Sequence, residues 1–83
     1  MEQNITGMTY KIREMAARIR ELREIENLSI REMAQKTGVS EEEYVACEKG
    51  ESDLHFAFIY RCAQTLNVDV TSLIEGHTPK LVN

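Results

Sequence analysis

Two helix-start motifs on either side of a glycine constrain the fold of this chain more than any other feature. The segments SIRE (29–32) and SEEE (40–43) both have the Ser-x-x-Glu spacing of a capping box, in which the hydroxyl and the carboxylate each satisfy a free backbone N–H. Gly38 precedes the second motif and Gly50 follows the helix that this motif begins. Glycine readily adopts the left-handed conformation that ends a helix, so residues 29–50 predict two short helices joined by a tight turn.

The short connection makes these two helices cross steeply instead of lying antiparallel, which is the helix-turn-helix arrangement. In such a unit the second helix projects and can enter the major groove of DNA. Apolar residues recur at spacings of three and four along most of the chain, which is the helical period. We therefore predict an all-α fold of five helices over about residues 10–26, 30–37, 41–49, 55–66 and 70–75, with Thr9 and Asp69 as N-caps of the first and the last.

The composition of the 83 residues is that of a small globular domain. Hydrophobic residues make up 42% and charged residues 29%, which excludes disorder as the main state, and no apolar run approaches the ~20 residues that cross a membrane. No secretory signal is visible, so we expect a cytoplasmic protein with no membrane partner. Cys47 and Cys62 are too few for a disulfide scaffold and are expected to be buried free thiols.

The sequence motifs that enzymes and metal sites use are missing. His55 and His77 lie at no metal-ligand spacing from a cysteine or an acid, and there is no Cys-x-x-Cys and no glycine-rich phosphate loop. Neither cysteine adjoins the basic residues that would favour a thiolate. We expect no catalytic residue, no metal site and no cofactor, and a chain that is not an enzyme.

Several short segments, in their order and spacing, resemble a known family. They are RIRELRE (18–24), LSIREMAQKTGVS (28–40), Tyr44, CEKG (47–50), Cys62, Ala63, Leu66, Val68 and Leu73. Together they resemble the lambda-repressor-like, or XRE-type, helix-turn-helix domain over about residues 17–75. The resemblance implies a compact five-helix domain, here with an extended first helix. We expect an N-terminal extension over 1–9, the helix-turn-helix domain over 10–76, and a tail or the start of a linker over 77–83.

The resemblance also implies a function, which is sequence-specific binding of double-stranded DNA in a bacterial or phage-like transcription regulator. The helix over about 41–49 would enter the major groove, and the start of the helix over 30–37 would face phosphate. Carried over by position, the phosphate contacts are Arg20, Ser29, Ile30 and Lys49, and the base contacts are Ser40, Glu41, Glu42, Val45 and Ala46. Relatives often join this domain to a C-terminal sensor domain, so a longer chain with such a domain is one hypothesis.

A structural ion pair between Arg23 and Glu48 is also implied by the resemblance. The physical reason is sound, because a largely buried glutamate needs a partner and a guanidinium can bond it with two hydrogen bonds. Such a pair would hold the helix over 41–49 against the first helix.

The helix expected to read bases departs from the family pattern in its charge. The whole chain has a net charge of −4, and residues 40–53 hold six acids against Lys49 alone. Family members usually place Gln, Arg, Ser, Thr or Asn where this chain has Glu41 and Glu42, whereas Glu43 is explained by its capping role. The alternative function is therefore a protein-interaction or dimerisation module on the same fold, with weakened DNA binding.

Two apolar surfaces could form the contact of a homodimer, which is a possible partner arrangement. One is a stripe with coiled-coil spacing on the first helix, formed by Met8, Ile12, Met15, Ile19 and Leu22, of which the last two are expected in the core. The first three either pack on the last helix or the tail, or form a dimer contact. The helix over 55–66 is expected to face inward through Phe56, Ile59, Cys62, Ala63 and Leu66. Phe58 and Tyr60 lie off that face and either widen the core or form a dimer surface.

Overall fold

The computed structural model describes the backbone of residues 2–76 and the side chains of residues 10–76. This part of the chain is built from helices and contains no strand. The helices are α1 (Glu2–Ile25), α2 (Ile30–Thr37), α3 (Glu41–Glu48), α4 (Phe56–Leu66) and α5 (Val70–Glu75). The all-α prediction is confirmed, and α2 to α5 lie within one residue of their predicted positions.

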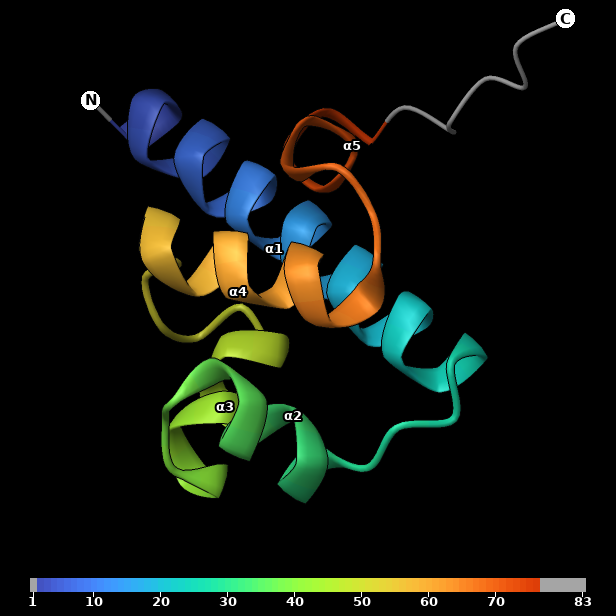
Figure 1. Cartoon of the computed structure of the whole chain (residues 1–83). Coiled ribbons are helices and arrows are strands. Elements are labelled where there is room, and N and C mark those ends of the chain that lie inside the picture. Colours follow the sequence, from blue (N-terminus) through green and yellow to red (C-terminus); the bar gives the residue numbers. More distant parts are fainter. Residues whose placement is uncertain (1, 77–83) are drawn as a thin grey trace, which may run out of the picture.

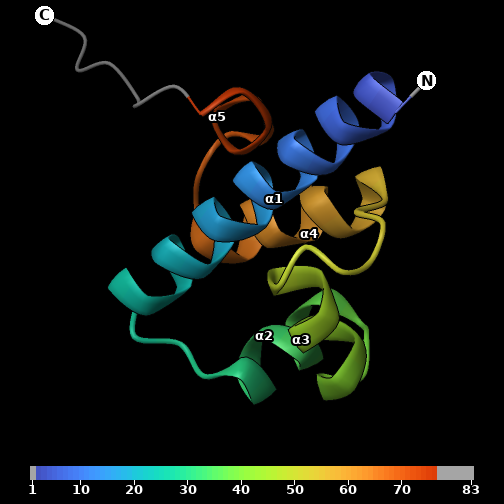
Figure 2. The same cartoon turned by 180° about the vertical axis from the view of Figure 1, so that it is seen from behind.

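The helices are arranged around two that cross the middle of the molecule, α1 and α4 (Figure 1). Helices α2 and α3 lie together on one side of this central pair, and α5 lies on the other side. The view from behind shows the same order, with α1 now in front of α4 (Figure 2). Helix α2 packs against α3 and α4, while α3 also packs against α1, so the helix-turn-helix unit is held from both central helices.

Helix α2 begins and ends as its sequence predicts. The Ser29 hydroxyl accepts from the N–H of Glu32 at 3.0 Å, and the Glu32 carboxylate accepts from the N–H of Ser29 at 2.8 Å, which completes the capping box. Gly38 ends the helix in the left-handed conformation with φ of 78°. These bonds are local, and local chemistry is what a single sequence shows most directly.

The second predicted capping box is only half formed. The Ser40 hydroxyl accepts from the N–H of Glu43 at 3.0 Å, but the Glu43 carboxylate does not return to the N–H of Ser40. It accepts a hydrogen bond from the Ser52 hydroxyl at 3.1 Å, in the loop that follows α3. The prediction was wrong on this bond because Ser52 lies close in space, which the four-residue motif cannot show.

The start of α1 is also a correction. The helix begins at Glu2 and not near Tyr10, so Thr9 lies inside it and is not its N-cap. The apolar spacing of Ile5 and Met8 continues the helical period upstream, and no proline interrupts it. At the other end of the chain Asp69 does hold the N-cap position of α5, but its side chain makes no capping hydrogen bond.

The core draws side chains from every helix of the described chain. It consists of Met15, Ile19, Met33, Ala34, Tyr44, Cys47, Phe58, Ile59, Cys62, Ala63, Leu66 and Leu73. Met15 and Ile19 from the α1 stripe are buried, Ile12 and Leu22 are half-buried, and the side chain of Met8 lies outside the described residues, as does the predicted tail over 77–83. Both cysteines are buried free thiols, as predicted. Burial raises the pKa of Cys47 to about 11 and that of Cys62 to about 12.

The structure decides the role of Phe58 on α4 and corrects the prediction for Phe56. Phe58 is buried and its ring lies 5.9 Å from that of Tyr44, so it widens the core. Phe56, which was expected to face inward, is 63% exposed. It is the first residue of α4, where no other helix covers it, and it stacks on the exposed Tyr60 with 6.3 Å between ring centroids.

Candidate nucleic-acid interface

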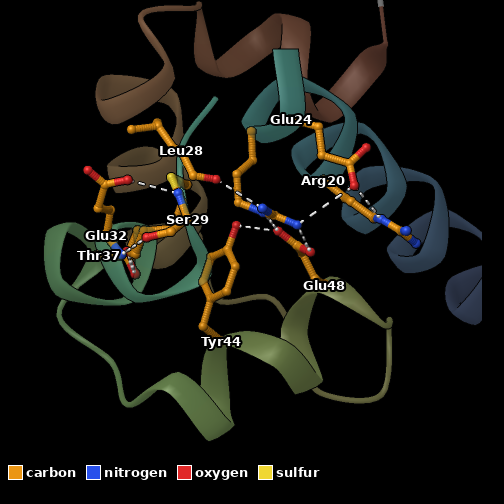
Figure 3. Close-up of polar contacts among 10 residues, drawn as sticks. Arg20, Glu24, Leu28, Ser29, Glu32, Thr37, Tyr44 and Glu48 are labelled. Atoms are coloured by element: carbon orange, nitrogen blue, oxygen red, sulfur yellow. Dashed lines mark hydrogen bonds and ion pairs between the residues drawn. The ribbon is translucent and has the colours of Figure 1, made fainter. Parts of the chain in front are cut away.

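A buried polar junction fixes α3 against α1 and is the base of the candidate interface. The predicted ion pair between Arg23 and Glu48 is present and has two hydrogen bonds, Nε to Oε2 at 2.6 Å and Nη2 to Oε1 at 3.2 Å. The Tyr44 hydroxyl donates to the same carboxylate at 2.6 Å (Figure 3). The side chains of Arg23 and Glu48 are only 12% and 8% exposed. Tyr44 and Glu48 lie on successive turns of the inward face of α3, so these hydrogen bonds fix both the position of the helix and its rotation about its axis.

The same guanidinium also holds the loop that leads into α2. Arg23 donates from Nη1 to the carbonyl oxygen of Leu28 at 3.0 Å, one residue before the Ser29 N-cap. The hydrogen bond to Glu48 raises the pKa of Arg23 above its usual value, and burial raises that of Tyr44. The start of α2 and the whole of α3 are therefore fixed relative to each other by one charged side chain.

A groove lies where α1, α2 and α3 meet. It is lined by Arg20, Arg23, Ile30, Val45, Glu48 and Lys49. Four of the nine predicted DNA contacts, Arg20, Ile30, Val45 and Lys49, are thus brought together although they come from three separate helices. A second, larger groove shares Arg20, Glu48 and Lys49 with it and extends along α1 as far as Arg13, with Glu21, Glu24 and Glu51 also in its lining.

The remaining predicted contacts lie beside these grooves or on the outward face of α3. Glu42, Val45, Ala46 and Lys49 follow one another at helical spacing and so share one side of the helix. Glu42 and Lys49 are exposed, whereas Val45 and Ala46 are half-buried. Ser29 and Ser40 are exposed N-caps whose oxygens accept from backbone N–H groups, so each hydroxyl hydrogen is left to donate.

The charges at this surface are partly compensated. Arg20 pairs with Glu24 at 3.2 Å (Figure 3), and Arg31 of α2 pairs with Glu41 of α3 at 3.0 Å. Glu42 and Lys49 make no ion pair with any side chain over residues 10–76. The pair between Arg31 and Glu41 could not be predicted from the sequence, because it joins the first turns of two helices and its spacing of ten residues follows no helical rule.

Gly50 brings the end of α3 directly against α1. Its φ is 73°, and a Cβ added there would lie 2.7 Å from Cγ and 3.3 Å from Cα of Arg13. Only glycine allows this approach without displacing the helix. The approach places Lys49 and Arg13 along the same groove.

Comparison with known proteins agrees with this geometry. A family model described as a helix-turn-helix domain matches residues 16–78, which is most of the chain. The chain belongs to this helix-turn-helix family. The lambda-repressor-like, XRE-type resemblance is thereby confirmed, and α2 and α3 are the two helices that give the family its name. No curated protein and no solved structure matches the chain.

Other kinds of site find no support in the described residues of this helix-turn-helix domain. Among the side chains of residues 10–76, no three of His, Cys, Asp or Glu are grouped so that they could hold a metal ion. In the same part of the chain, no helix combines the length and the apolar character that crossing a membrane requires. The family to which the chain belongs is typically non-enzymatic and suggests DNA as the partner.

Proposed function

We propose that this helix-turn-helix domain binds double-stranded DNA sequence-specifically as a transcription regulator, with α3 in the major groove. The observation that supports this most is the groove where α1, α2 and α3 meet. It gathers Arg20 and Arg23 of α1 and Lys49 at the end of α3 beside the start of α2, together with Glu48, the ion-pair partner of Arg23. A protein that docks a helix into the major groove is positioned by phosphate contacts from the elements beside that helix.

The proposed phosphate contacts come from three elements. The start of α2 offers the Ser29 hydroxyl and the free backbone N–H groups of an eight-residue helix, which favour an anion. Arg20 on α1 and Lys49 at the end of α3 supply positive charge in the groove beside it. Ile30 lines the same groove as Arg20 and Lys49 and would pack against the sugar-phosphate backbone.

The proposed base contacts lie on α3. Glu41 and Glu42 can accept from the amino group of cytosine, and Ser40 can exchange hydrogen bonds with any base. Val45 and Ala46 present apolar surface that suits the methyl group of thymine. A recognition helix with three glutamates in its first turn would bind DNA with lower affinity than a basic helix, because these carboxylates repel the phosphates.

Further parts of this proposal concern the assembly. A homodimer would place two copies of α3 about 34 Å apart on a palindromic site. A C-terminal sensor domain in a longer chain would couple that dimer to an effector. We place the regulator in the bacterial cytoplasm, where its DNA would be.

Capture of genomic DNA fragments tests the proposal. The purified chain is mixed with fragments at about 50 mM and about 200 mM salt, because phosphate contacts weaken steeply over this range. Enrichment of one sequence at the lower salt supports the proposal, and no retention at either salt contradicts it. The variant Lys49→Ala should weaken binding to all sequences and lower the salt slope by about one. The matched control is Lys36→Ala, which removes an exposed lysine from the opposite end of α2 from Ser29.

A protein-interaction module is the second candidate, and the charge of α3 favours it. Glu41, Glu42 and Glu43 fill the first turn, and no basic residue lies in the last. The double variant Glu41→Gln/Glu42→Gln separates the two functions. If α3 binds DNA against its own charge, affinity rises for many sequences; if the glutamates read cytosine, it falls for the selected site alone. If they bind a basic protein, DNA binding stays absent and partner binding falls.

A further inference from the structure

The ion pair between Arg31 and Glu41 joins the first turns of α2 and α3, and neither the capping motifs nor the core requires it. Its two side chains are 76% and 53% exposed, and the bond joins Arg31 Nε to Glu41 Oε2 at 3.0 Å. Ion pairs this exposed contribute little to folding stability. The contact therefore adds little to the fold, but it bridges the element proposed to face phosphate and the element proposed to face bases.

Both partners keep unused hydrogen-bonding capacity. Arg31 donates only from Nε, so the N–H groups of both Nη atoms make no hydrogen bond within residues 10–76. Glu41 accepts only through Oε2, so its other oxygen is available. A guanidinium neutralises the charge of the carboxylate beside it and holds that carboxylate in one orientation.

We propose that Arg31 is a specificity-determining residue that positions Glu41 to accept from the amino group of one cytosine while its own Nη groups contact a phosphate. This inference rests on the proposed DNA-binding function and adds a residue and a base to it. Arg31 reduces the repulsion between Glu41 and the phosphates, so an acidic first turn becomes compatible with a polyanion. Glu42, which has no such partner among residues 10–76, then accounts for most of the remaining repulsion.

A double-mutant cycle on DNA affinity tests this coupling. The wild-type chain first selects duplexes from a random library at about 50 mM salt, and the best duplex is then varied one base pair at a time. Affinities are measured for the wild type, Arg31→Ala, Glu41→Gln and the double variant. Both positions are exposed and Glu41→Gln is isosteric, and circular dichroism checks that each variant keeps the helical fold.

We expect Arg31→Ala to weaken binding to the selected duplex by roughly tenfold or more, because a phosphate contact is lost and Glu41 is left uncompensated. In the Glu41→Gln background the same change should cost only a few-fold, because no charge remains to be compensated. Glu41→Gln should also abolish the preference for cytosine at a single position of the site. A neutral amide no longer offers two carboxylate oxygens to the arginine and the base.

Three outcomes would overturn the inference. If Arg31→Ala costs the same in both backgrounds, Arg31 is only a phosphate contact and does not position Glu41. If neither variant changes affinity or base preference while the wild type still selects a site, the pair lies off the interface and the proposed function stands without it. If the wild type selects no site at all, the proposed function and this inference both fail. The matched control is the cycle Lys11→Ala/Glu14→Gln, on an ion pair of α1 whose residues line neither groove, and this cycle should leave DNA affinity unchanged.

Discussion

The two sides of α3 differ in almost every physical property. The inward side holds Tyr44, Cys47 and Glu48, which are buried in the core or bonded to Arg23 with distances of 2.6 to 3.2 Å. The outward side holds exposed glutamates and a lysine whose ion pairs are few and open to water. The comparison teaches that placement and recognition are separate tasks in this helix, so changes on one side should leave the other task intact.

Removal of the buried carboxylate should have the largest effect on stability. Glu48→Ala leaves the Arg23 guanidinium and the Tyr44 hydroxyl without their shared partner in a nearly dry site. We expect a loss of about 3–5 kcal/mol in the free energy of unfolding, measured by urea titration. Glu48→Gln, which still accepts hydrogen bonds, should lose clearly less. Equal losses in the two variants would show that shape, and not the ion pair, holds α3 in place.

The turn after α3 should show the next largest effect. Gly50→Ala combines a left-handed backbone with a Cβ placed 2.7 Å from Cγ of Arg13, and we expect a loss of about 2–3 kcal/mol. Gly38→Ala is the matched control, because its φ is also positive but the nearest atom is the flexible end of Arg61 at 3.3 Å. Thermal unfolding compares the two variants. If Gly38→Ala loses as much stability as Gly50→Ala, backbone strain alone explains both losses and the contact with Arg13 adds nothing.

The capping box of α2 should give a smaller, pH-dependent effect. The hydrogen bond from the backbone N–H of Ser29 lowers the pKa of Glu32 below its ordinary value of 4.5. Because the folded pKa is the lower one, this stabilisation is present above pH 4.5 and is lost as the pH falls through the folded pKa. The difference in unfolding free energy between the wild type and Glu32→Gln should therefore shrink below pH 4.5. A difference that stays constant from pH 7 to pH 3 would argue against the charged capping bond.

The outward side should show the smallest stability effect. Glu42→Gln changes an exposed side chain that makes no ion pair within residues 10–76, so we expect less than about 0.5 kcal/mol in either direction. The free energy of DNA binding is expected to change more than the free energy of unfolding. A large loss of stability would contradict the claim that the outward side of α3 does not contribute to folding.

Much of the fold can be predicted from the sequence because its decisive signals are local. The α2 cap at Ser29 and its stop at Gly38 need only residues within a few positions of each other. The ion pair between Arg23 and Glu48 was accessible only through family resemblance, since nothing local joins residues 25 positions apart. Once the ends of α2 and the ion pair between Arg23 and Glu48 are known, the inward side of α3 is fixed, and the residues of its outward side can be inferred.

Features set by tertiary contacts could not be predicted in the same way. Whether Phe56 or Phe58 enters the core depends on how the loop after α3 delivers the first turn of α4, and both residues fit a helical stripe. Glu43 prefers Ser52 to its own cap because the loop folds back toward α3. The ion pair between Arg31 and Glu41 could not be predicted for the same reason, because the two residues become neighbours only when α2 and α3 cross.

The most direct test of the account maps the DNA-contacting surface residue by residue. Backbone amide shifts of the isotope-labelled chain are followed by NMR while the selected duplex is added at about 50 mM salt. The account predicts that the largest shifts cluster at the start of α2 around Ser29 and on α3 from Glu41 to Lys49, while α5 is unchanged. Shifts confined to the exposed aromatic pair of α4, Phe56 and Tyr60, with α3 unperturbed, would contradict it.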